Sequence, residues 1–466
     1  MKTLKVVHVP YTFAPDSVGG TEIYVETLAH GLKAHGVESL VVAPSAGGDD
    51  QAYEHGGLRV RRFRSASDSD DMLREAYGGG DPVAAAAFAE ILDEETPDAV
   101  HLHSFSRAVS VRFVRAARQR GIPVLFTYHT PTVSCQRGTL MLWGARMCDG
   151  VLDVGRCTSC SMQSRGMPRW ATGVLNGMPS GLAKAVDKSG RSGGLWTALR
   201  MPELVRRQQE AFHSLMREVD VIITLSEWSR TVLIRNGIPE SKVARVQHWL
   251  PSAPDAQGSL LDVASVPLKV AFLGRAVRIK GADTLIRAML KIPDVQIELH
   301  LYGVAQDAND EGYWAELRSL AAHDPRIKFL PSVPNDKVVS LLKGYHLLAM
   351  PARGVENRPL VLLESIAAGT PIIGSDLGGV AELVNHMKDG LLVDPEDVSG
   401  WADALRSCAE DRSLLSRLRN GVRMPRARSD VAEEMAKLYF SRVRRPAVVS
   451  SDYGRAQSMR AQYRPE

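Results

Sequence analysis

Short apolar runs alternate with amphipathic segments along most of the chain. Residues 4–9 form an apolar run, residues 21–35 repeat apolar positions with a helical period, and residues 39–43 form a second run. Residues 268–273 and 282–290 repeat this order in the second half of the chain. Strands that alternate with helices indicate parallel sheets covered by helices. The pattern therefore predicts an α/β protein with two doubly wound, Rossmann-like domains.

The two predicted domains should face each other. Ligands of doubly wound sheets bind beyond the carboxyl ends of the strands, so two facing sheets form a cleft. Residues 251–267 begin with a stretch rich in proline and glycine and are expected to link an N-terminal domain (1–250) to a C-terminal domain (268–428). We expect the domains to close about this linker.

Two further segments follow the second domain. Residues 429–443 predict a helix with Val431, Met435, Leu438 and Tyr439 on one apolar face. Residues 444–466 are basic and polar, and they predict a disordered tail.

Composition narrows the class of protein. A chain of 466 residues is too long for one ordinary hydrophobic core, so two domains are expected. A hydrophobic share of 44% with 24% charged residues is typical of a soluble globular protein. A net charge of +4 does not call for a nucleic-acid partner, although it would tolerate an anionic membrane surface. No apolar run reaches membrane-spanning length or forms the core of a signal peptide. We expect a cytoplasmic protein, either free or peripheral on the inner membrane face.

The most informative segment is residues 353–371, where two glutamates flank the predicted start of a helix. Pro359 suits the first helical position because its ring fixes φ and it lacks an N–H, and Gly369 suits the helix end. Glu356 then lies in the preceding loop and Glu364 in the second turn. The free N–H groups between them suit phosphate. The pair predicts a site for a ligand with a central phosphate and hydroxyls at both ends, but it also fits a buried helix with two incidental carboxylates.

A second candidate site for phosphate follows the strand 268–273. Arg275 and Lys280 lie between this strand and the helix 282–290, and Gly274 and Gly281 flank them. Their charge could stabilise a leaving diphosphate, with bidentate geometry from arginine and a compact charge from lysine. Basic residues in such a loop are often only solvated, so the interpretation depends on the glutamate segment downstream.

These two motifs together resemble the C-terminal domain of the retaining glycosyltransferases of family 4. The Glu-x7-Glu spacing is followed, as in that family, by Ala-Ala-Gly-Thr-Pro and a later Gly-Gly pair. The resemblance implies that Glu356 contacts hydroxyls of the donor sugar, that Glu364 contacts the ribose, and that the basic pair binds the diphosphate. The family's Gly-Phe-Gly after the first glutamate is here Asn-Arg-Pro. The implied donor-binding residues are Gly19, Gly20, Gly274, Arg275, Lys280, Val333, Glu356, Asn357, Arg358, Pro359, Leu360 and Glu364.

The first half of the chain also resembles that family. The Gly19-Gly20 pair resembles a loop where the main chain approaches the ligand closely. His129 ends an apolar strand and corresponds to a family residue at the reacting sugar, whereas His101 and His103 are interpreted as mainly structural. The resemblance covers most of residues 1–440, and it implies the GT-B fold with a last helix that packs back on the first domain.

The segment 130–202 departs from the family because it is far longer than a connection from strand to helix should be. It contains Cys135, Cys148, Cys157 and Cys160 with the spacing Cys-x12-Cys-x8-Cys-x2-Cys. The last pair has the spacing of a metal knuckle, and four thiolates could close a structural zinc site. Reduced or disulfide-paired cysteines and an iron–sulfur or redox role are the alternatives, and a cytoplasmic location disfavours stable disulfides. We expect this insertion to cover the acceptor side of the cleft, although its later part could contact a membrane.

The resemblance implies transfer of a sugar from a UDP- or GDP-sugar to a hydroxyl acceptor with retention of anomeric configuration. The acceptor would be a saccharide, a lipid-linked glycan or a small metabolite, as in polysaccharide or glycolipid biosynthesis. The candidate catalytic residues are His129, Arg275, Lys280 and Glu356, and no catalytic metal is expected because fixed cations stabilise the diphosphate.

Three alternatives remain open at this point. They are a nucleotide-sugar epimerase on the same fold, a non-catalytic subunit that binds sugar nucleotides, and a zinc protein that binds nucleic acid. The last is disfavoured because no basic patch interleaved with aromatic residues accompanies the cysteines.

Overall fold

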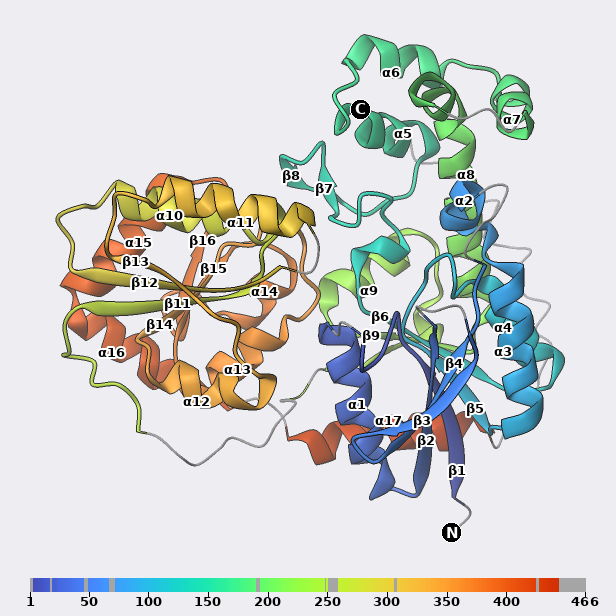
Figure 1. Cartoon of the computed structure of the whole chain (residues 1–466), viewed down its shortest axis with the longest axis horizontal. Helices are drawn as coiled ribbons and strands as arrows, with labels where there is room; N and C mark the ends of the chain where they lie inside the picture. Colours follow the sequence, from blue (N-terminus) through green and yellow to red (C-terminus); the bar gives the residue numbers. More distant parts are fainter. Residues whose placement is uncertain are drawn as a thin grey trace.

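The computed structural model describes residues 3–16, 19–45, 49–66, 72–189, 193–247, 249, 259–305, 308–424 and 427–443. Two α/β domains lie side by side, each with a sheet between helices, and a smaller helical lobe projects from the first (Figure 1). This architecture confirms the predicted fold class. The predicted tail (444–466) and residues 251–258 of the predicted linker lie outside the described residues.

The first sheet has eight strands in the order β10-β9-β6-β5-β1-β2-β4-β3. All neighbouring strands are parallel except β3 and β4. The pairing of β1 with β5 sets His8 beside His101. The strands are β1 (Leu4–Val9), β2 (Val37–Pro44), β3 (Gln51–His55), β4 (Leu58–Phe63), β5 (Ala99–Leu102), β6 (Val124–Tyr128), β9 (Val221–Thr224) and β10 (Val243–Arg245).

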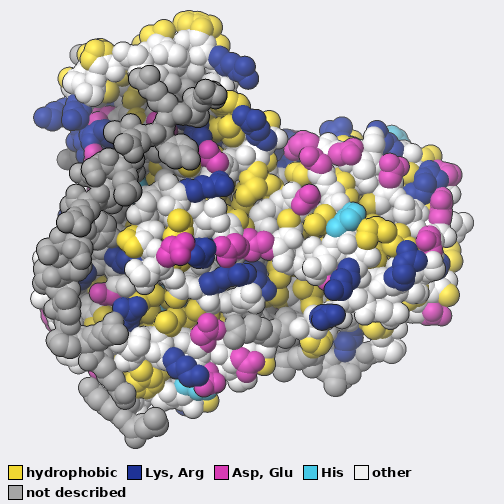
Figure 2. Space-filling model, turned by 180° about the vertical axis from the view of Figure 1, so that it is seen from behind, with side chains coloured by type: hydrophobic (Ala, Val, Ile, Leu, Met, Phe, Trp, Pro, Cys, Tyr) yellow, Lys and Arg dark blue, Asp and Glu magenta, His cyan; other side chains and the backbone are white. Residues whose placement is uncertain are grey.

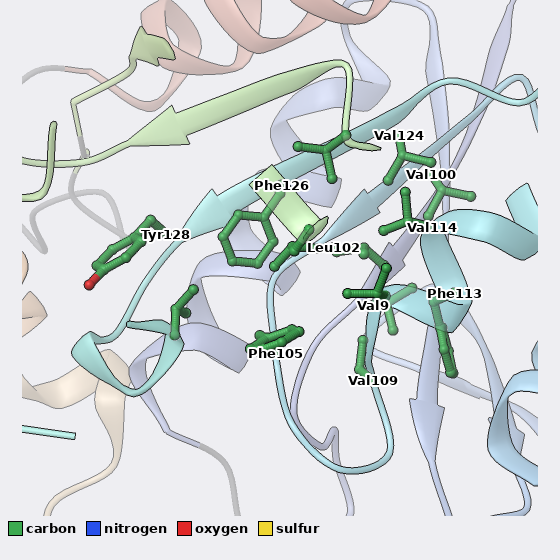
Figure 3. Close-up of a cluster of buried hydrophobic side chains, with 14 of the residues drawn as sticks. Val9, Val100, Leu102, Phe105, Val109, Phe113, Val114, Val124, Phe126 and Tyr128 are labelled. Carbon is green, nitrogen blue, oxygen red and sulfur yellow. The ribbon is translucent and has the colours of Figure 1, made fainter. Parts of the chain in front are cut away.

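Both faces of this sheet are apolar because helices cover both. One face packs on α3, α4 and the later part of α8, and the other packs on α1. Figure 3 shows the first of these cores, where Phe105, Phe113 and Phe126 gather around β1, β5 and β6. Each such buried side chain contributes about 1.5–3 kcal/mol. The helices are α1 (Gly20–Lys33), α2 (Met72–Arg74), a π-helical turn (Glu75–Gly79), α3 (Pro82–Glu95), α4 (Val111–Gln119), α8 (Gly194–Glu218), α9 (Glu227–Arg235) and a 3-10 turn (Glu240–Lys242).

The second sheet has six parallel strands in the order β13-β12-β11-β14-β15-β16. Helices α10, α11, α15 and α16 cover one face, and α12, α13 and α14 cover the other. The strands are β11 (Leu268–Arg275), β12 (Ile297–Val304), β13 (Ile327–Leu330), β14 (Leu347–Met350), β15 (Ile372–Ser375) and β16 (Gly390–Val393). The helices are α10 (Ala282–Leu290), α11 (Ala308–Leu320), α12 (Val338–Lys343), α13 (Leu360–Ala368), α14 (Gly378–Leu383), α15 (Val398–Glu410) and α16 (Arg412–Gly421), with 3-10 turns at Arg278–Lys280 and Asn335–Lys337.

The described part of the predicted linker, residues 259–267, lies against the second domain. Val263 packs on the core under α10 and α15, and the Leu261 carbonyl accepts a hydrogen bond from Arg419. These apolar and backbone contacts make this part of the segment an edge of the second domain rather than a free link.

The last described helix, α17 (Arg428–Val443), returns to the first domain and lies beside α1 (Figure 1). Val431, Met435 and Tyr439 are buried in the same core as α1. The Tyr439 hydroxyl lies 2.6 Å from Nδ1 of His101. The apolar face read from the sequence is therefore the face that α17 buries.

The cysteine-containing insertion lies between β6 and β9 and forms the projecting lobe (Figure 1). Met162, Leu175 and Met201 belong to a small core of its own, and α8 runs from this core into the first domain. None of the described helices combines the length and apolar character needed to span a membrane. The elements of the insertion lobe are a 3-10 turn (Pro131–Val133), β7 (Met141–Leu142), β8 (Arg146–Met147), α5 (Val154–Gln163), α6 (Arg169–Asn176) and α7 (Ser180–Lys188).

Candidate functional site

Residues 353–358, which we call the glutamate loop, connect β14 to α13 and carry Glu356. Within the second domain, the Arg353 N–H donates to the Ile279 carbonyl at 2.8 Å. The Arg353 guanidinium donates to both carboxylate oxygens of Asp283, at 3.0 and 2.9 Å. The loop is thus fixed at its start by the turn and helix that follow β11.

The end of the glutamate loop passes very close to α14. The Gly379 N–H donates to the Glu356 carbonyl at 2.8 Å. A Cβ on Gly379 would lie 1.7 Å from the Asn357 carbonyl oxygen, so no larger residue fits there. The Gly-Gly pair of the sequence motif is explained by this close approach of two backbones.

The first domain holds the same loop from the other side. The buried amide of Asn357 donates through Nδ2 to the Tyr128 carbonyl and accepts from the Ser226 hydroxyl through Oδ1. The Trp228 indole N–H donates to the Glu356 carbonyl at 3.1 Å. Both ends of the Asn357 side-chain amide join the two domains, and the donor contact that the resemblance implies for this residue stays a prediction.

Lys280 and Glu356 form an ion pair although they lie 76 positions apart in the sequence. Lys280 Nζ lies 2.7 Å from Glu356 Oε1, and each side chain is 24% exposed. Gly281, which follows Lys280, has φ +72°, and a Cβ there would lie 1.9 Å from the Pro351 carbonyl oxygen. A glycine at this position therefore sets the turn that directs Lys280 toward the glutamate loop.

Arg275 lies at the end of β11, and its side chain is directed to α11. Its Nη2 lies 3.3 Å from Asp310 Oδ2, and the side chain is 48% exposed. The strand extends through Gly274 and Arg275, so the predicted loop is shorter than the sequence indicated. The structure thus brings Lys280, but not Arg275, into direct contact with Glu356.

The N-termini of α13 and α1 meet between the domains. Helix α13 begins at Leu360, so Pro359 precedes the first helical residue instead of being that residue. A Cβ on Gly20 at the start of α1 would lie 3.7 Å from Leu360 Cδ1, and Gly19 and Gly20 are exposed. Two helix N-termini with positive dipole ends therefore lie close together beside the Lys280–Glu356 pair, an arrangement that favours an anion.

Glu364 lies in the second turn of α13 and is only 9% exposed. Burial raises the pKa of its carboxyl group to about 7. The group therefore changes its charge near neutral pH, and a ligand that donates hydrogen bonds to the carboxylate would favour the ionised form.

His129 follows β6 and is held by a chain of buried imidazoles. His103 lies 3.1 Å from His129 on one side and 3.1 Å from His8 on the other, measured between ring nitrogens. Burial lowers the pKa of His8 to about 3 and that of His103 well below its usual value, so both rings are neutral at neutral pH. Since His129 directly follows Tyr128, it lies beside the Asn357 bond that joins the domains.

His8, His101 and His103 also have ring nitrogens close enough to share a metal ion. However, both ring nitrogens of His101 have partners, the Tyr439 hydroxyl at 2.6 Å and the Thr127 hydroxyl at 2.7 Å. These contacts fit the interpretation of His101 and His103 as structural groups.

The other predicted donor-binding residues lie on the same side of the second sheet. Val333 follows β13 and packs, half-buried, on the core under α12 and α13. Arg358 is half-buried at the end of the glutamate loop. The structure thus spreads the predicted set around the start of α13.

The four cysteines of the insertion are free and half-buried, and they line one cavity. We searched the described residues for groups of three His, Cys, Asp or Glu whose ligand atoms lie within 4.8 Å of one another. The only such group in this part of the chain is His8, His101 and His103. No three of the four sulfurs lie within 4.8 Å of one another, and the zinc site stays a prediction.

Trp228 and Glu382 are site residues for which sequence analysis assigned no role. The Glu382 carboxylate accepts from the backbone N–H groups of Glu227 and Trp228, at 2.8 and 2.7 Å, and so joins α14 to the start of α9. Glu382 lies three residues after the Gly-Gly pair of the C-terminal motif, and Trp228 lies outside the motifs described above.

Comparison with known families assigns each half of the chain. The family described as "Glycosyl transferases group 1" matches residues 263–424. The family described as "Glycosyl transferase 4-like domain" matches residues 19–249. The first match covers the second domain, and the second covers the first domain from Gly19 onward together with its insertion.

Curated relatives match over part of their length. D-inositol 3-phosphate glycosyltransferase of Corynebacterium urealyticum is 30% identical over 177 residues, 36% of this chain and 42% of that protein. The protein of the same name from Nocardia farcinica is 32% identical over 181 residues, 38% of this chain and 40% of that protein. The chain thus spans less than half the length of these relatives.

Solved structures match over nearly the whole chain. Sucrose-phosphate synthase from Thermosynechococcus elongatus has a TM-score of 0.64 at 18% identity and covers 94% of this chain and 98% of its own. HepE of Anabaena in complex with UDP and glucose has a TM-score of 0.59 at 16% identity and covers 94% of this chain and 100% of its own. At these identities the matches bear on the fold, and they confirm the predicted GT-B arrangement.

Proposed function

Since the chain is a GT-B protein of the group 1 glycosyltransferases, we propose that it transfers a sugar from a nucleoside diphosphate sugar to a hydroxyl acceptor with retention of anomeric configuration. The observation that carries this proposal is the Lys280–Glu356 pair beside the N-terminus of α13. A cation, a carboxylate and free helix N–H groups together suit a ligand with a diphosphate next to a sugar.

The donor would lie along the start of α13. Its diphosphate would bind the N-terminus of α13 and Lys280, and Arg275 would bind it after leaving Asp310. Its ribose hydroxyls would donate to Glu364, and its sugar hydroxyls to Glu356. Positive charge at the diphosphate stabilises the negative charge that grows on the leaving oxygen in the transition state.

The proposed reaction proceeds on one face of the sugar. The bond from the anomeric carbon to the diphosphate oxygen breaks, and the acceptor oxygen forms a bond to that carbon from the same face. The acceptor proton passes to an oxygen of the leaving diphosphate, so no protein nucleophile is needed. His129 would hydrogen-bond to the transferred sugar, and Lys280, Arg275 and the helix end make a catalytic metal unnecessary.

UDP- and GDP-sugars are the proposed donors. The acceptor would be a saccharide, a lipid-linked glycan or a small metabolite, which places the reaction in polysaccharide, glycolipid or glycosylated metabolite synthesis. The names of the relatives, which include inositol phosphate glycosyltransferases and a UDP-bound protein, support this range.

The insertion lobe supports a lipid-linked acceptor and a peripheral position on the inner membrane face. Trp170 on α6 is 75% exposed and Leu195 on α8 is 70% exposed, and Arg169, Lys184 and Lys188 of the same lobe are exposed. Figure 2 shows apolar and basic side chains on this lobe. Apolar anchors with basic residues suit an anionic lipid surface.

Lys280→Ala and Glu356→Gln should each lower kcat/KM for transfer by about 10²–10³, because each removes a group that stabilises the transition state. Transfer would be followed as nucleoside diphosphate release that depends on an acceptor, after thermal-shift screening identifies the donor. Lys291→Ala, which changes an exposed lysine paired with Ser399, is the matched control. Both site variants working within about twofold of wild type would refute the assignment, and turnover without an acceptor would indicate an epimerase.

Donor binding should weaken at low pH because both oxygens of Glu364 accept from the ribose hydroxyls only when its carboxyl group is ionised. The pKa of about 7 in the free protein implies a dissociation constant about tenfold larger one pH unit below this value than one unit above it. Isothermal titration of the nucleotide sugar checks this. Glu364→Gln should bind weakly with a flat pH profile, and an unchanged profile in this variant would contradict the role of Glu364.

The wild-type protein should float with vesicles that contain phosphatidylglycerol and less with vesicles of phosphatidylcholine alone. Replacing Trp170 and Val174 together by serine should lower the partition coefficient at least about tenfold, because both large apolar side chains are exposed. Met424→Ser removes another exposed apolar residue, 63% exposed against 75% for Trp170 and 68% for Val174, and is the control. Equal flotation of both variants would exclude the lobe as the membrane contact.

A further inference from the structure

The cavity in the insertion gathers all four of its cysteines from separate segments. Cys135 and Cys148 lie on the two sides of the β7–β8 hairpin, and Cys157 and Cys160 lie on α5. All four are free thiols that are neither fully buried nor exposed. The first and last of these cysteines are 25 positions apart in the sequence, yet all four line one cavity. Four thiols around one cavity form a set of soft ligands that suits a metal ion or cluster.

Donor groups surround the sulfur atoms. The Trp143 N–H donates to Cys160 Sγ at 3.2 Å, and the Arg137 guanidinium lies 3.8 Å from the same sulfur. These groups would offset part of the negative charge of four thiolates.

Zinc and iron bind the thiolate form of cysteine, so each thiol that binds the metal releases one proton to solvent.

The spacing of the sulfur atoms bears on which metal fits. A tetrahedral zinc site with Zn–S bonds of about 2.3 Å holds its sulfurs about 3.8 Å apart. In the described structure no three of these sulfurs lie within 4.8 Å of one another. Zinc would therefore draw the hairpin and α5 together, whereas an iron–sulfur cluster is a larger group held by the same four thiolates.

The hairpin between the first two cysteines also touches the glutamate loop. The Val355 N–H donates to the Thr139 carbonyl at 3.0 Å. Thr139 lies four residues after Cys135 and one residue before Leu140, whose carbonyl accepts from the Cys148 N–H at 2.7 Å. A metal that fixes both cysteines would therefore fix the carbonyl that holds the loop of Glu356.

A second path leads through α9. The side chain of Asn236 donates to the Gly150 carbonyl at 2.8 Å and accepts from the Leu152 N–H at 2.8 Å. Gly150 packs so closely on Val232 that a Cβ there would lie 2.5 Å from a Val232 methyl group. The same helix carries Trp228, which bonds to the Glu356 carbonyl.

We propose that Cys135, Cys148, Cys157 and Cys160 hold a thiolate-bound metal centre, zinc or an iron–sulfur cluster, which braces the glutamate loop through Thr139 and α9. The metal site does not depend on the reaction that the protein catalyses. The bracing extends the proposed function, because it makes donor affinity depend on the centre.

The first test uses the full chain, purified without chelators and without an immobilised metal column. Elemental analysis and acid-labile sulfide should show either about one zinc per chain in colourless protein, or iron with sulfide and visible absorption. Either result supports the centre and identifies it. Protein without metal, whose four thiols react freely with a thiol reagent in the native state, would overturn it.

The second test measures the brace. Cys157→Ser with Cys160→Ser should lose the metal, whereas Cys408→Ala, in the core of the second domain, should keep it. Because the double variant could fail to fold, the wild type is also stripped with a chelator and reloaded. Affinity for the nucleotide sugar found by thermal-shift screening should fall about five- to tenfold on stripping, as for a lost hydrogen bond, and return on reloading, while affinity for free UDP or GDP stays within about threefold because Glu356 contacts the sugar. Metal loss without any change in affinity would overturn the bracing, while failure of the proposed transfer reaction would leave this nucleotide-binding test intact.

Discussion

The side-chain amide of Asn357 joins the two domains beside Glu356 and His129, the two residues to which the proposed reaction assigns the transferred sugar. It bonds to the carbonyl of Tyr128, next to His129, and to the hydroxyl that caps α9. Both contacts are buried, so breaking either leaves a polar group without a partner, at a cost of about 1–3 kcal/mol. Because Asn357 follows Glu356 directly, the first domain positions a carboxylate that belongs to the second.

The rest of the site follows from this constraint. Gly379 and Gly281 allow the backbone of the glutamate loop and the turn before α10 to come close enough for Lys280 to reach Glu356. The start of α13 then lies against the start of α1, and the insertion contacts the loop from above through Thr139. Each of these contacts is short and specific. The two large hydrophobic cores stabilise the sheets, and the loops that make the contacts follow the ends of their strands.

Periodic patterns predicted the fold because they depend on local sequence. The strand at residues 4–9 and the helix at residues 282–290 appear with the predicted bounds, and the apolar face of residues 429–443 is the one that is buried. Motif spacing also placed Glu356 before α13 and Glu364 within it. The one-residue shift at Pro359 arises because its φ and its missing N–H suit the residue before a helix as well as the first residue in it.

Contacts between distant residues could not be predicted in this way. Asn357 occupies a position where the family has glycine, and only the fold shows that it lies against residues 229 and 131 positions away. Trp228 and Thr139 act through an indole N–H and a backbone carbonyl, for which no sequence pattern exists. The cysteine spacing predicted a shared site, but not the cavity or its contact with the glutamate loop.

The most direct test of this account compares Asn357→Ala with the wild type in two assays on the same protein. The account predicts that affinity for the free nucleoside diphosphate stays within about threefold, because α13 and Glu364 are unchanged, while the transfer rate falls about 10- to 100-fold. A variant that transfers sugar at the wild-type rate would contradict the claim that the first domain sets the position of Glu356.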